Sequence, residues 1–307
     1  ASFDSMVIKR WPPAMSKPAD ADAIDPADAD AAPPPTAAPS AGEPTLSIVI
    51  PALNEQDNVQ PLVEQVEAHV RNAGVKAELI VVDDGSDDQT LPRLRELAGA
   101  RPWLVILHRP TRQGQSAAMH AGIHAARGRY VATLDADLQN DPAELPVMLG
   151  LLEERGVDLV QGDRSADRQD TAIRKWGSIV GRKARLWLLG DKVRDTGCSA
   201  RVLKAEYATQ LPLQFKGMHR FIPCYVGLLG GKIAETPVRH RPRHTGTTKY
   251  GMGLLSRGPA GLMDCLAVRW MRKRLRDTAV QPIQPAATTA ERSVTSDPAQ
   301  EAHAGSA

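Results

Sequence analysis

Short apolar runs alternate with helical patterns along the first half of the chain. The runs have the length of buried strands and lie at 46–50, 79–82, 103–107 and 130–134. Apolar residues three and four apart predict a helix from Val59 to Val70, with Gly74 as its C-terminal stop. Further helices are predicted around 91–97 and over 115–127. This alternation predicts an α/β fold with a mostly parallel sheet and helices on both faces.

The pattern becomes less regular after Gln139. A strand is predicted at 158–161, a helix over 171–189 and another strand near 232–238, which leads into a basic loop at 239–249. The sequence therefore predicts fewer strands and helices for the second half of the chain than for the first.

The last pattern, at 256–276, predicts a helix that begins at Gly258-Pro259, with proline in the first turn. Leu262, Leu266 and Trp270 recur every four residues, and basic residues gather at the end: Arg269, Arg272, Lys273, Arg274 and Arg276. Such a helix lies in an anionic membrane interface or packs on the core with a solvated basic end. No run approaches the roughly 18 apolar residues of a membrane span, so we expect peripheral attachment.

Composition separates two tails from the rest. Residues 1–44 are rich in Ala, Pro and Asp, and residues 277–307 in Ala, Thr, Ser, Gln and Pro, so both are expected to be disordered. The start lacks a secretory signal pattern. The tails carry net charges of −4 and −3, which leaves +9 on the part between them and favours an anionic partner. The three cysteines are far apart, which fits a reducing compartment.

Acidic residues follow the predicted strands at the edge where ligands bind in parallel sheets. Asn54-Glu55, Asp83-Asp84 and the pair Asp135 and Asp137 should therefore converge on one cleft. Two carboxylates one residue apart suit Mg²⁺ or Mn²⁺, with the other ligands from diphosphate and water. The alternative for the later pair is a helix start, and that for the earlier pair is a tight turn with an Asx cap, which can also hold alongside a binding role.

Four motifs closely resemble family 2 glycosyltransferases of the GT-A fold. They are IVIPALNE at 48–55, VVDDGS at 81–86, RQGQ at 112–115 and DADLQ at 135–139. The resemblance covers about residues 45–276 and points within the family to the dolichol- or undecaprenyl-phosphate branch. It implies a GT-A, Rossmann-like domain over 45–255, followed by the interfacial helix.

The resemblance also implies roles for individual residues. Asp135 and Asp137, with Gln139 as a third candidate, would hold the metal ion. Asp84 and Glu55 would accept hydrogen bonds from the nucleoside base and ribose. The expected nucleotide-binding residues are Pro51, Leu53, Glu55, Val82, Asp84 and Ala136.

The branch is indicated by two basic segments. Gly162-Asp163-Arg164 resembles a segment whose arginine contacts donor phosphate or sugar. The loop RHTGTTK at 243–249 resembles an Arg-x-x-Gly-x-Ser-Lys loop that closes over phosphates, with Thr248 in place of serine. Arg164, Arg243 and Lys249 are thus expected to be catalytic together with Asp137. Otherwise the second loop is a solvated basic stretch.

The segment DTGCSAR at 195–201 occupies the place of the acceptor loop. It departs from the Ser-Gly-Phe form of dolichol-phosphate mannose synthases, which weakens any assignment of mannose as the sugar. Cys198 is expected to be a buried packing residue and not a nucleophile. Asp195 would serve as a catalytic base only if the acceptor is a hydroxyl group.

Together these patterns predict an inverting, metal-dependent enzyme at the cytoplasmic face of a membrane. It would move a sugar from a nucleoside diphosphate to a polyprenyl phosphate. One alternative is a saccharide hydroxyl acceptor, although the Gln-x-x-Arg-Trp element of processive enzymes is absent from the sequence. Another is a non-catalytic nucleotide-sugar or membrane-binding module. Nucleic-acid binding is not expected, since no reading module accompanies the basic charge.

Overall fold

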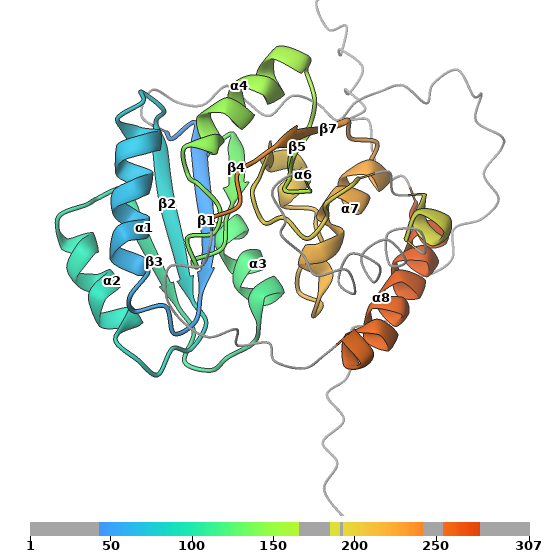
Figure 1. The fold of residues 1–307 in the computed structure, drawn as a ribbon, viewed down its shortest axis with the longest axis horizontal. Helices are drawn as coiled ribbons and strands as arrows, with labels where there is room; N and C mark the ends of the chain where they lie inside the picture. Colours follow the sequence, from blue (N-terminus) through green and yellow to red (C-terminus); the bar gives the residue numbers. More distant parts are fainter. Residues whose placement is uncertain (1–42, 166–184, 191–192, 242–253, 277–307) are drawn as a thin grey trace, which may run out of the picture. The chain divides into compact units, whose positions relative to one another are not determined.

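A seven-stranded sheet forms the centre of the computed structural model, which describes residues 43–165, 185–190, 193–241 and 254–276 (Figure 1). Across the sheet the strand order is β3-β2-β1-β4-β6-β5-β7. The strands are β1 (Leu46–Ala52), β2 (Ala77–Asp83), β3 (Leu104–His108), β4 (Tyr130–Thr133), β5 (Leu159–Asp163), β6 (Arg201–Lys204) and β7 (Ile233–Pro237).

Only β6 runs against the other strands of this sheet. β1 pairs in parallel with β2 and β4, β2 with β3, and β5 with β7, whereas β6 is antiparallel to both β4 and β5. Because β6 is reversed, it begins at the edge where the parallel strands end. Arg201, its first residue, is in register with Thr133 of β4 and Gln161 of β5.

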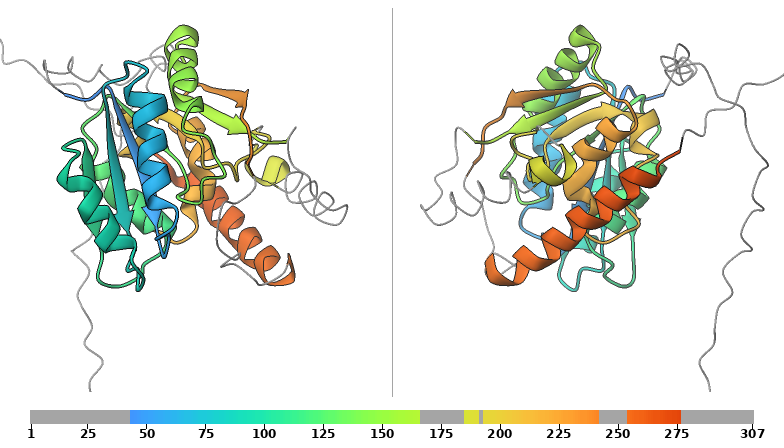
Figure 2. Two further views of the ribbon diagram at one scale, coloured as in Figure 1. Left: turned by 60° about the vertical axis from the view of Figure 1, so that its left-hand side comes forward. Right: turned by 90° about the vertical axis from the view of Figure 1, so that its right-hand side faces the viewer.

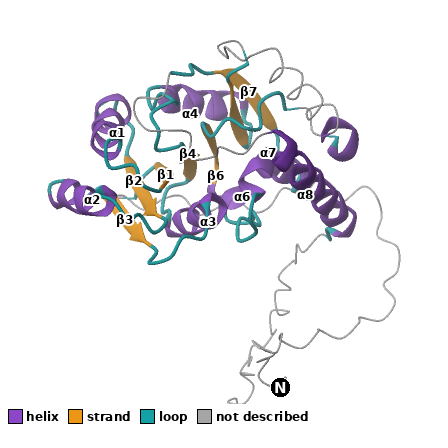
Figure 3. Ribbon diagram, turned by 60° about the horizontal axis from the view of Figure 1, so that its bottom comes forward, coloured by secondary structure: helices purple, strands orange, loops and turns teal. Residues whose placement is uncertain are grey.

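Helices cover both faces of the sheet (Figure 3). One face carries α1 (Val59–Val66), α2 (Thr90–Gly99) and α4 (Glu144–Arg155). Their residues Leu62, Leu94 and Met148 are almost completely buried in one core cluster with Ile48 and Val81. Alternate strand residues such as Val49 and Val82 belong to the cluster on the other face, as the two-residue repeat of a strand requires.

The second face carries α3 (Gln115–Ala125), α6 (Ala205–Ala208), the 3₁₀ turn η3 (Met218–Phe221), α7 (Ile222–Leu228) and α8 (Leu254–Arg274). Figure 2 shows α8 running across this side of the domain. Its Val268 is completely buried, and Cys265 and Met271 pack against the same cluster. The predicted mostly parallel α/β architecture is thus confirmed.

Several boundaries differ from the sequence-based expectations. The first helix is α-helical only to Val66 and continues as a π-helical turn, η2 (Glu67–Arg71), before Gly74. The last helix begins at Leu254, so the predicted start at Gly258 is wrong. Of the helix expected over 171–189, only 185–189 is described, and it is helical. The predicted tails fall outside the described residues, apart from residues 43 and 44.

Candidate active site

The predicted site residues gather at the edge where the parallel strands end. β1, β2, β4 and β5 lead into Asn54, Asp84, Asp135 and Arg164, respectively. The segment before β6, at 193–200, runs along the same edge because β6 starts there. Hydrogen bonds described below connect these loops, so the convergence expected from the sequence is realised for the described residues.

Asp135 and Asp137 form the turn after β4. Asp135 Oδ1 accepts a hydrogen bond of 2.8 Å from Gln115 Nε2, at the start of α3. Asp137 is buried, and its Oδ1 accepts from the Gln139 backbone N–H at 3.2 Å. Leu138 has a φ of 61°, a left-handed conformation that non-glycine residues rarely adopt and that is concentrated at functional sites.

The donor set of this turn fits a divalent cation that is shared with a ligand. Burial, and then the neighbouring Asp137 carboxylate, raise the pKa of Asp135, so a nearby cation would relieve the crowding of negative charge. In the described ranges no group of three or more His, Cys, Asp and Glu side chains could hold a metal. Asp135 and Asp137 alone would leave most coordination positions of such an ion to oxygen ligands from diphosphate and water, as is usual for Mg²⁺.

Gln139 lies beside the start of the basic loop. Its Nε2 is 3.4 Å from Nε2 of His240, and its backbone carbonyl accepts from the Arg241 N–H at 2.9 Å. Arg241 also contacts the Asp141 carboxylate. The beginning of the predicted loop is thus tied to the acidic turn, whereas Arg243 and Lys249 lie outside the described residues.

The ends of β1 and β2 are joined to each other and to α3. Both carboxylate oxygens of Asp84 are used: Oδ1 accepts from the Gln113 N–H at 3.0 Å and Oδ2 from the Gly114 N–H at 2.6 Å. Asp84 therefore holds the start of α3 in place. Its oxygens keep lone pairs for a further donor.

The remaining nucleotide-binding candidates line the same loops. Glu55 Oε2 accepts from Asn58 Nδ2 at 2.7 Å, and its backbone N–H donates to Thr90 Oγ1 at 2.8 Å. Pro51 and Leu53 are half-buried, and Val82 and Ala136 are buried.

The turn after β2 is capped by the side chain of Asp83. Asp83 Oδ1 accepts a hydrogen bond of 3.3 Å from the Ser86 N–H, and Asp83 Oδ2 lies 2.7 Å from His108 Nδ1. The structural alternative for this acidic pair is therefore realised. It does not conflict with a binding role for Asp84.

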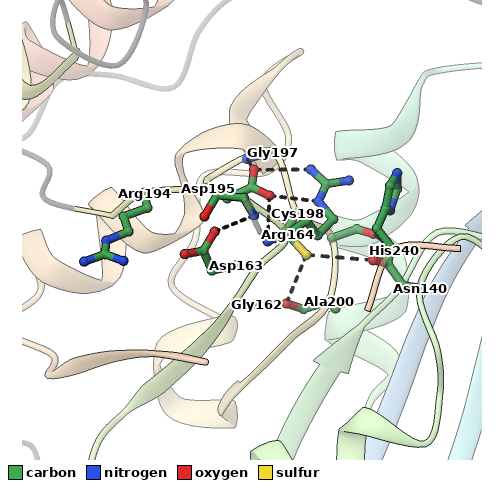
Figure 4. Close-up of polar contacts among 12 residues, drawn as sticks. Asn140, Gly162, Asp163, Arg164, Arg194, Asp195, Gly197, Cys198, Ala200 and His240 are labelled. Atoms are coloured by element: carbon green, nitrogen blue, oxygen red, sulfur yellow. Dashed lines mark hydrogen bonds and ion pairs between the residues drawn. The ribbon is translucent and has the colours of Figure 1, made fainter. Parts of the chain in front are cut away.

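Arg164 and Asp195 form a bidentate ion pair (Figure 4). Arg164 Nε donates to Asp195 Oδ2 at 2.8 Å, and Nη2 donates to Oδ1 at 3.2 Å. The N–H groups of Arg164 and Gly197 donate to the same carboxylate at 3.3 and 3.1 Å. Both residues are largely buried. The carboxylate is thus engaged on both oxygens, which disfavours Asp195 as a base.

The loop before β6 packs closely on β5. A Cβ added to Gly162 would lie 2.9 Å from the Ala200 carbonyl oxygen, so only glycine fits at this place. Burial raises the pKa of the Cys198 thiol to about 11, and its Sγ lies 3.8 Å from Asn140 Oδ1 (Figure 4). A buried, protonated thiol agrees with the expected packing role.

Arg201 is a site residue that the sequence analysis did not single out. It is almost completely buried, and its guanidinium donates to the backbone carbonyls of His219, at 3.0 Å, and Cys198. Burial lowers its pKa to about 10, which leaves it charged near Asp135. The available signal was an arginine at the head of the four-residue strand RVLK, which also ends in a lysine.

Helix α8 presents different residues to the core and to solvent. Arg269 and Arg272 donate to the carbonyls of Leu188 and Leu189 at 2.9 and 2.7 Å, next to the buried Val268. The predicted row of Leu262, Leu266 and Trp270 is exposed. Also exposed are Met263 of the same helix and Leu186 and Trp187 of the short helix at 185–189. In the ranges described, no helix combines the length and apolar character needed to span a bilayer.

The reversed strand, the acidic edge and the helices on both faces are those of a GT-A-type α/β protein. A family model described as glycosyl transferase family 2 matches residues 47–211, and the chain belongs to this family. Two solved structures share the fold. One is glucosyl-3-phosphoglycerate synthase from Mycobacterium tuberculosis with Mn²⁺, uridine diphosphate and phosphoglyceric acid (TM-score 0.54, 23% identity, 76% of this chain and 80% of that one). The other is a mannosyltransferase from Pyrobaculum calidifontis with GDP-Man and Mn²⁺ (TM-score 0.52, 16% identity, 78% and 66%).

Curated relatives agree with the predicted branch of the family. The chain is 40% identical over 240 residues to dodecaprenyl-phosphate galacturonate synthase from Rhizobium johnstonii, which covers 75% of this chain and 68% of the relative. It is 34% identical over 230 residues to undecaprenyl-phosphate 4-deoxy-4-formamido-L-arabinose transferase from Edwardsiella ictaluri, covering 74% and 69%. The resemblance to the polyprenyl-phosphate branch is confirmed.

Proposed function

We propose that this protein is an inverting glycosyltransferase that moves a sugar from a nucleoside-diphosphate-sugar to a polyprenyl phosphate. The names of the two relatives support the class of acceptor. The observation that carries the proposal is the bidentate pairing of Asp195 with Arg164. It engages the best candidate base on both oxygens, so an acceptor that needs no base suits the site better than a hydroxyl group.

The donor diphosphate would be bound at the turn after β4. Asp135 and Asp137 would hold Mg²⁺ or Mn²⁺, with Gln139 as a weaker candidate. The cation supplies Lewis-acid stabilisation of the diphosphate leaving group. Asp84 and Glu55 would accept hydrogen bonds from the base and ribose, and Pro51, Leu53, Val82 and Ala136 would border the nucleotide. The crowded, partly buried carboxylates of the turn support this assignment.

The acceptor phosphate needs positive charge and no base. It is anionic at neutral pH, so its oxygen can attack the anomeric carbon without first losing a proton to the protein. Arg164, Arg243 and Lys249 would neutralise the two phosphorylated substrates and allow them to approach each other. Catalysis would then consist mostly of positioning and charge stabilisation.

A hydroxyl acceptor would require Asp195 to act as a general base. A general base must reach the proton that it removes, and its lone pairs must be available. Asp195 instead accepts two bonds from the Arg164 side chain and two from backbone N–H groups. A phosphate acceptor therefore suits this geometry better.

Helix α8 would place the enzyme on its lipid substrate. Leu262, Leu266 and Trp270 are exposed on α8, and Trp187, on the short helix that α8 contacts, is 81% exposed. Apolar side chains beside the basic end of α8 suit the interface of an anionic membrane. We propose peripheral attachment at the cytoplasmic face.

Mass spectrometry of lipid extracts tests the reaction class directly. The protein would be incubated with undecaprenyl phosphate, Mg²⁺ and a pool of UDP- and GDP-sugars. We expect a new lipid whose mass identifies the sugar transferred. Release of nucleotide without a lipid product would point to a hydroxyl acceptor or water. No consumption of donor by a protein that binds metal would favour a binding module.

A further inference from the structure

A side chain from α3 reaches the acidic turn after β4. Gln115, the first residue of α3, donates from Nε2 to Asp135 Oδ1 at 2.8 Å, although the two residues are 20 positions apart in the chain. The orientation of the amide follows from its partner, because an ionised carboxylate only accepts hydrogen bonds and therefore faces the NH₂ group. The bond joins two different elements of the fold, so it depends on where α3 begins.

The start of α3 is fixed by the end of β2. Asp84 accepts from the N–H groups of Gln113 at 3.0 Å and Gly114 at 2.6 Å. Gly114 has a φ of 96°, a conformation that glycine adopts without strain, and its carbonyl accepts from the Ala118 N–H at 3.1 Å. The chain therefore enters the helix at a set position, and Gln115 follows directly.

The next residue of α3 is held by a distant part of the chain. Ser116 is buried, and its Oγ lies 2.7 Å from His219 Nδ1 and accepts from the His219 N–H at 3.2 Å. His219 belongs to η3, 103 positions further along the chain. Contacts from two separate parts of the fold thus fix the residues on either side of Gln115. Its amide can bind Asp135 with little further loss of backbone freedom.

The hydrogen bond restricts how the Asp135 carboxylate can turn. A carboxylate offers about four lone-pair positions, and the Gln115 amide uses one of them on Oδ1. The other positions remain for further partners, including a cation. A carboxylate that is already held in one orientation loses less conformational freedom when it binds an ion, and preorganisation of this kind raises affinity.

We propose that Gln115 is a positioning residue that holds the Asp135 carboxylate in the orientation in which it binds a divalent cation. This inference rests on the proposed function, in which Asp135 and Asp137 bind the metal. Hydrogen-bond partners of metal ligands typically contribute ~10–100-fold to metal affinity. Because Asp84 fixes the same segment, residues 113–115 connect the expected nucleoside site with the metal site.

The test is titration of the full-length protein with Mn²⁺, followed by the electron paramagnetic resonance signal of free Mn²⁺. UDP or GDP is present, whichever the wild type binds more tightly. Gln115→Met keeps the length of the side chain but removes the donor, and we expect it to weaken Mn²⁺ binding by about 10-fold or more. Affinity for the nucleotide in EDTA should not change, because Gln115 acts on the metal ligand. A parallel loss of that affinity would show a general structural defect and would overturn the proposal.

Two further variants separate the amide donor from the stability of the helix start. Gln60→Met removes an exposed glutamine that donates to Glu64 at 3.0 Å, and it should leave Mn²⁺ affinity unchanged. Ser116→Ala loosens the start of α3 but keeps the donor, so its effect on Mn²⁺ affinity should be smaller than that of Gln115→Met. Equal losses in Gln115→Met and Ser116→Ala would contradict the positioning role, because the effect would then come from the helix start alone.

Asp137→Ala separates failure of this inference from failure of the proposed function. If Asp137→Ala abolishes Mn²⁺ binding while a folded Gln115→Met variant stays within twofold of the wild type, the positioning role is wrong and the metal site stands. If Asp137→Ala changes nothing, or if the wild type binds Mn²⁺ with neither nucleotide, the metal site itself is refuted.

Discussion

Both halves of the sheet contribute site residues to the same edge, but these residues are held in place in different ways. From β1 to β4, each site residue follows an apolar strand and is fixed by backbone groups of another loop, as Asp84 is by the N–H groups of Gln113 and Gly114. From β5 onward, buried side chains of opposite charge pair with each other, as Arg164 and Asp195 do. The position after an apolar strand therefore marks the site residues of the first half, whereas ion pairing between side chains holds those of the second half.

Loss of a metal ligand tests the first half and has the largest expected effect. Asp137→Ala should weaken metal-dependent UDP binding by more than ~100-fold, since a ligand contributes more than the residues that orient it. Isothermal calorimetry with and without Mn²⁺ measures this. Asp57→Ala, on the exposed surface, is the matched control. Unchanged affinity in Asp137→Ala would contradict the assignment of the acidic turn to the donor.

The exposed side of α8, which belongs to the second half of the domain, gives the next largest expected effect. Replacing Leu262, Leu266 and Trp270 with serine should weaken binding to anionic liposomes by about 30-fold, because three partly inserted apolar side chains contribute roughly 2 kcal/mol. UDP binding in solution should not change. Val268→Ala, on the buried side, should instead lower the free energy of unfolding by about 1–2 kcal/mol. Equal flotation of the triple variant and the wild type with liposomes would exclude this surface as the anchor.

How far the sequence could predict the fold differs between the same two halves. The apolar runs of β1, β2 and β4 and the acidic residues after them were readable, because burial on both faces of a parallel sheet requires such runs. Strand β6 could not be predicted from the sequence, since it has only four residues and starts with Arg201. The buried guanidinium of Arg201 is stabilised by the hydrogen bonds that it donates to the carbonyls of Cys198 and His219.

Individual site residues also differ in whether the sequence could assign them. Asp135 and Asp137 could be assigned from their position after a strand. The pairing of Asp195 with Arg164 could not, because the two residues are 31 positions apart and no local pattern joins them.

A conservative change at Asp195 distinguishes a phosphate from a hydroxyl acceptor. Asp195→Asn keeps a hydrogen-bonding side chain beside Arg164, so with a phosphate acceptor we expect kcat to fall less than ~10-fold, whereas loss of a general base costs ~10²–10⁴-fold. The rate of lipid product formation at saturating donor gives the answer. Thermal unfolding of the variant provides the control for folding. A collapse of kcat with unchanged UDP affinity would revive the hydroxyl acceptor.

The contact between the halves gives the smallest expected effect. Burial, then Arg220 and Arg201, lower the pKa of His219 to about 3, and its Nδ1 lies 2.7 Å from Ser116 Oγ of α3. The unfolded chain binds a proton near pH 6.5 and the folded chain does not, so stability is lost as pH falls below 6.5. We expect a loss on the order of 1 kcal/mol between pH 7 and 5.5 from this residue.

Urea unfolding at the two pH values measures that loss. His219→Gln should reduce the pH dependence, and His69→Gln, at an exposed position, should leave it unchanged. The same pH dependence in His219→Gln and the wild type would show that the imidazole does not remain neutral in the folded protein.

The reversed strand also affects the order in which the domain folds. β4 pairs with β6 between Tyr130 and Lys204, whereas β1 and β2 are separated only by the crossover at 53–76 that contains α1 and η2. Pairing of distant segments is slow because closing a long loop costs entropy. We therefore expect the amides of β1 and β2 to gain protection from hydrogen exchange before those of β6 during refolding. Pulse labelling would measure this, and simultaneous protection would contradict it. The carboxylates after β4 would then be in place early, and the loop before β6 that carries Asp195 would reach the site last.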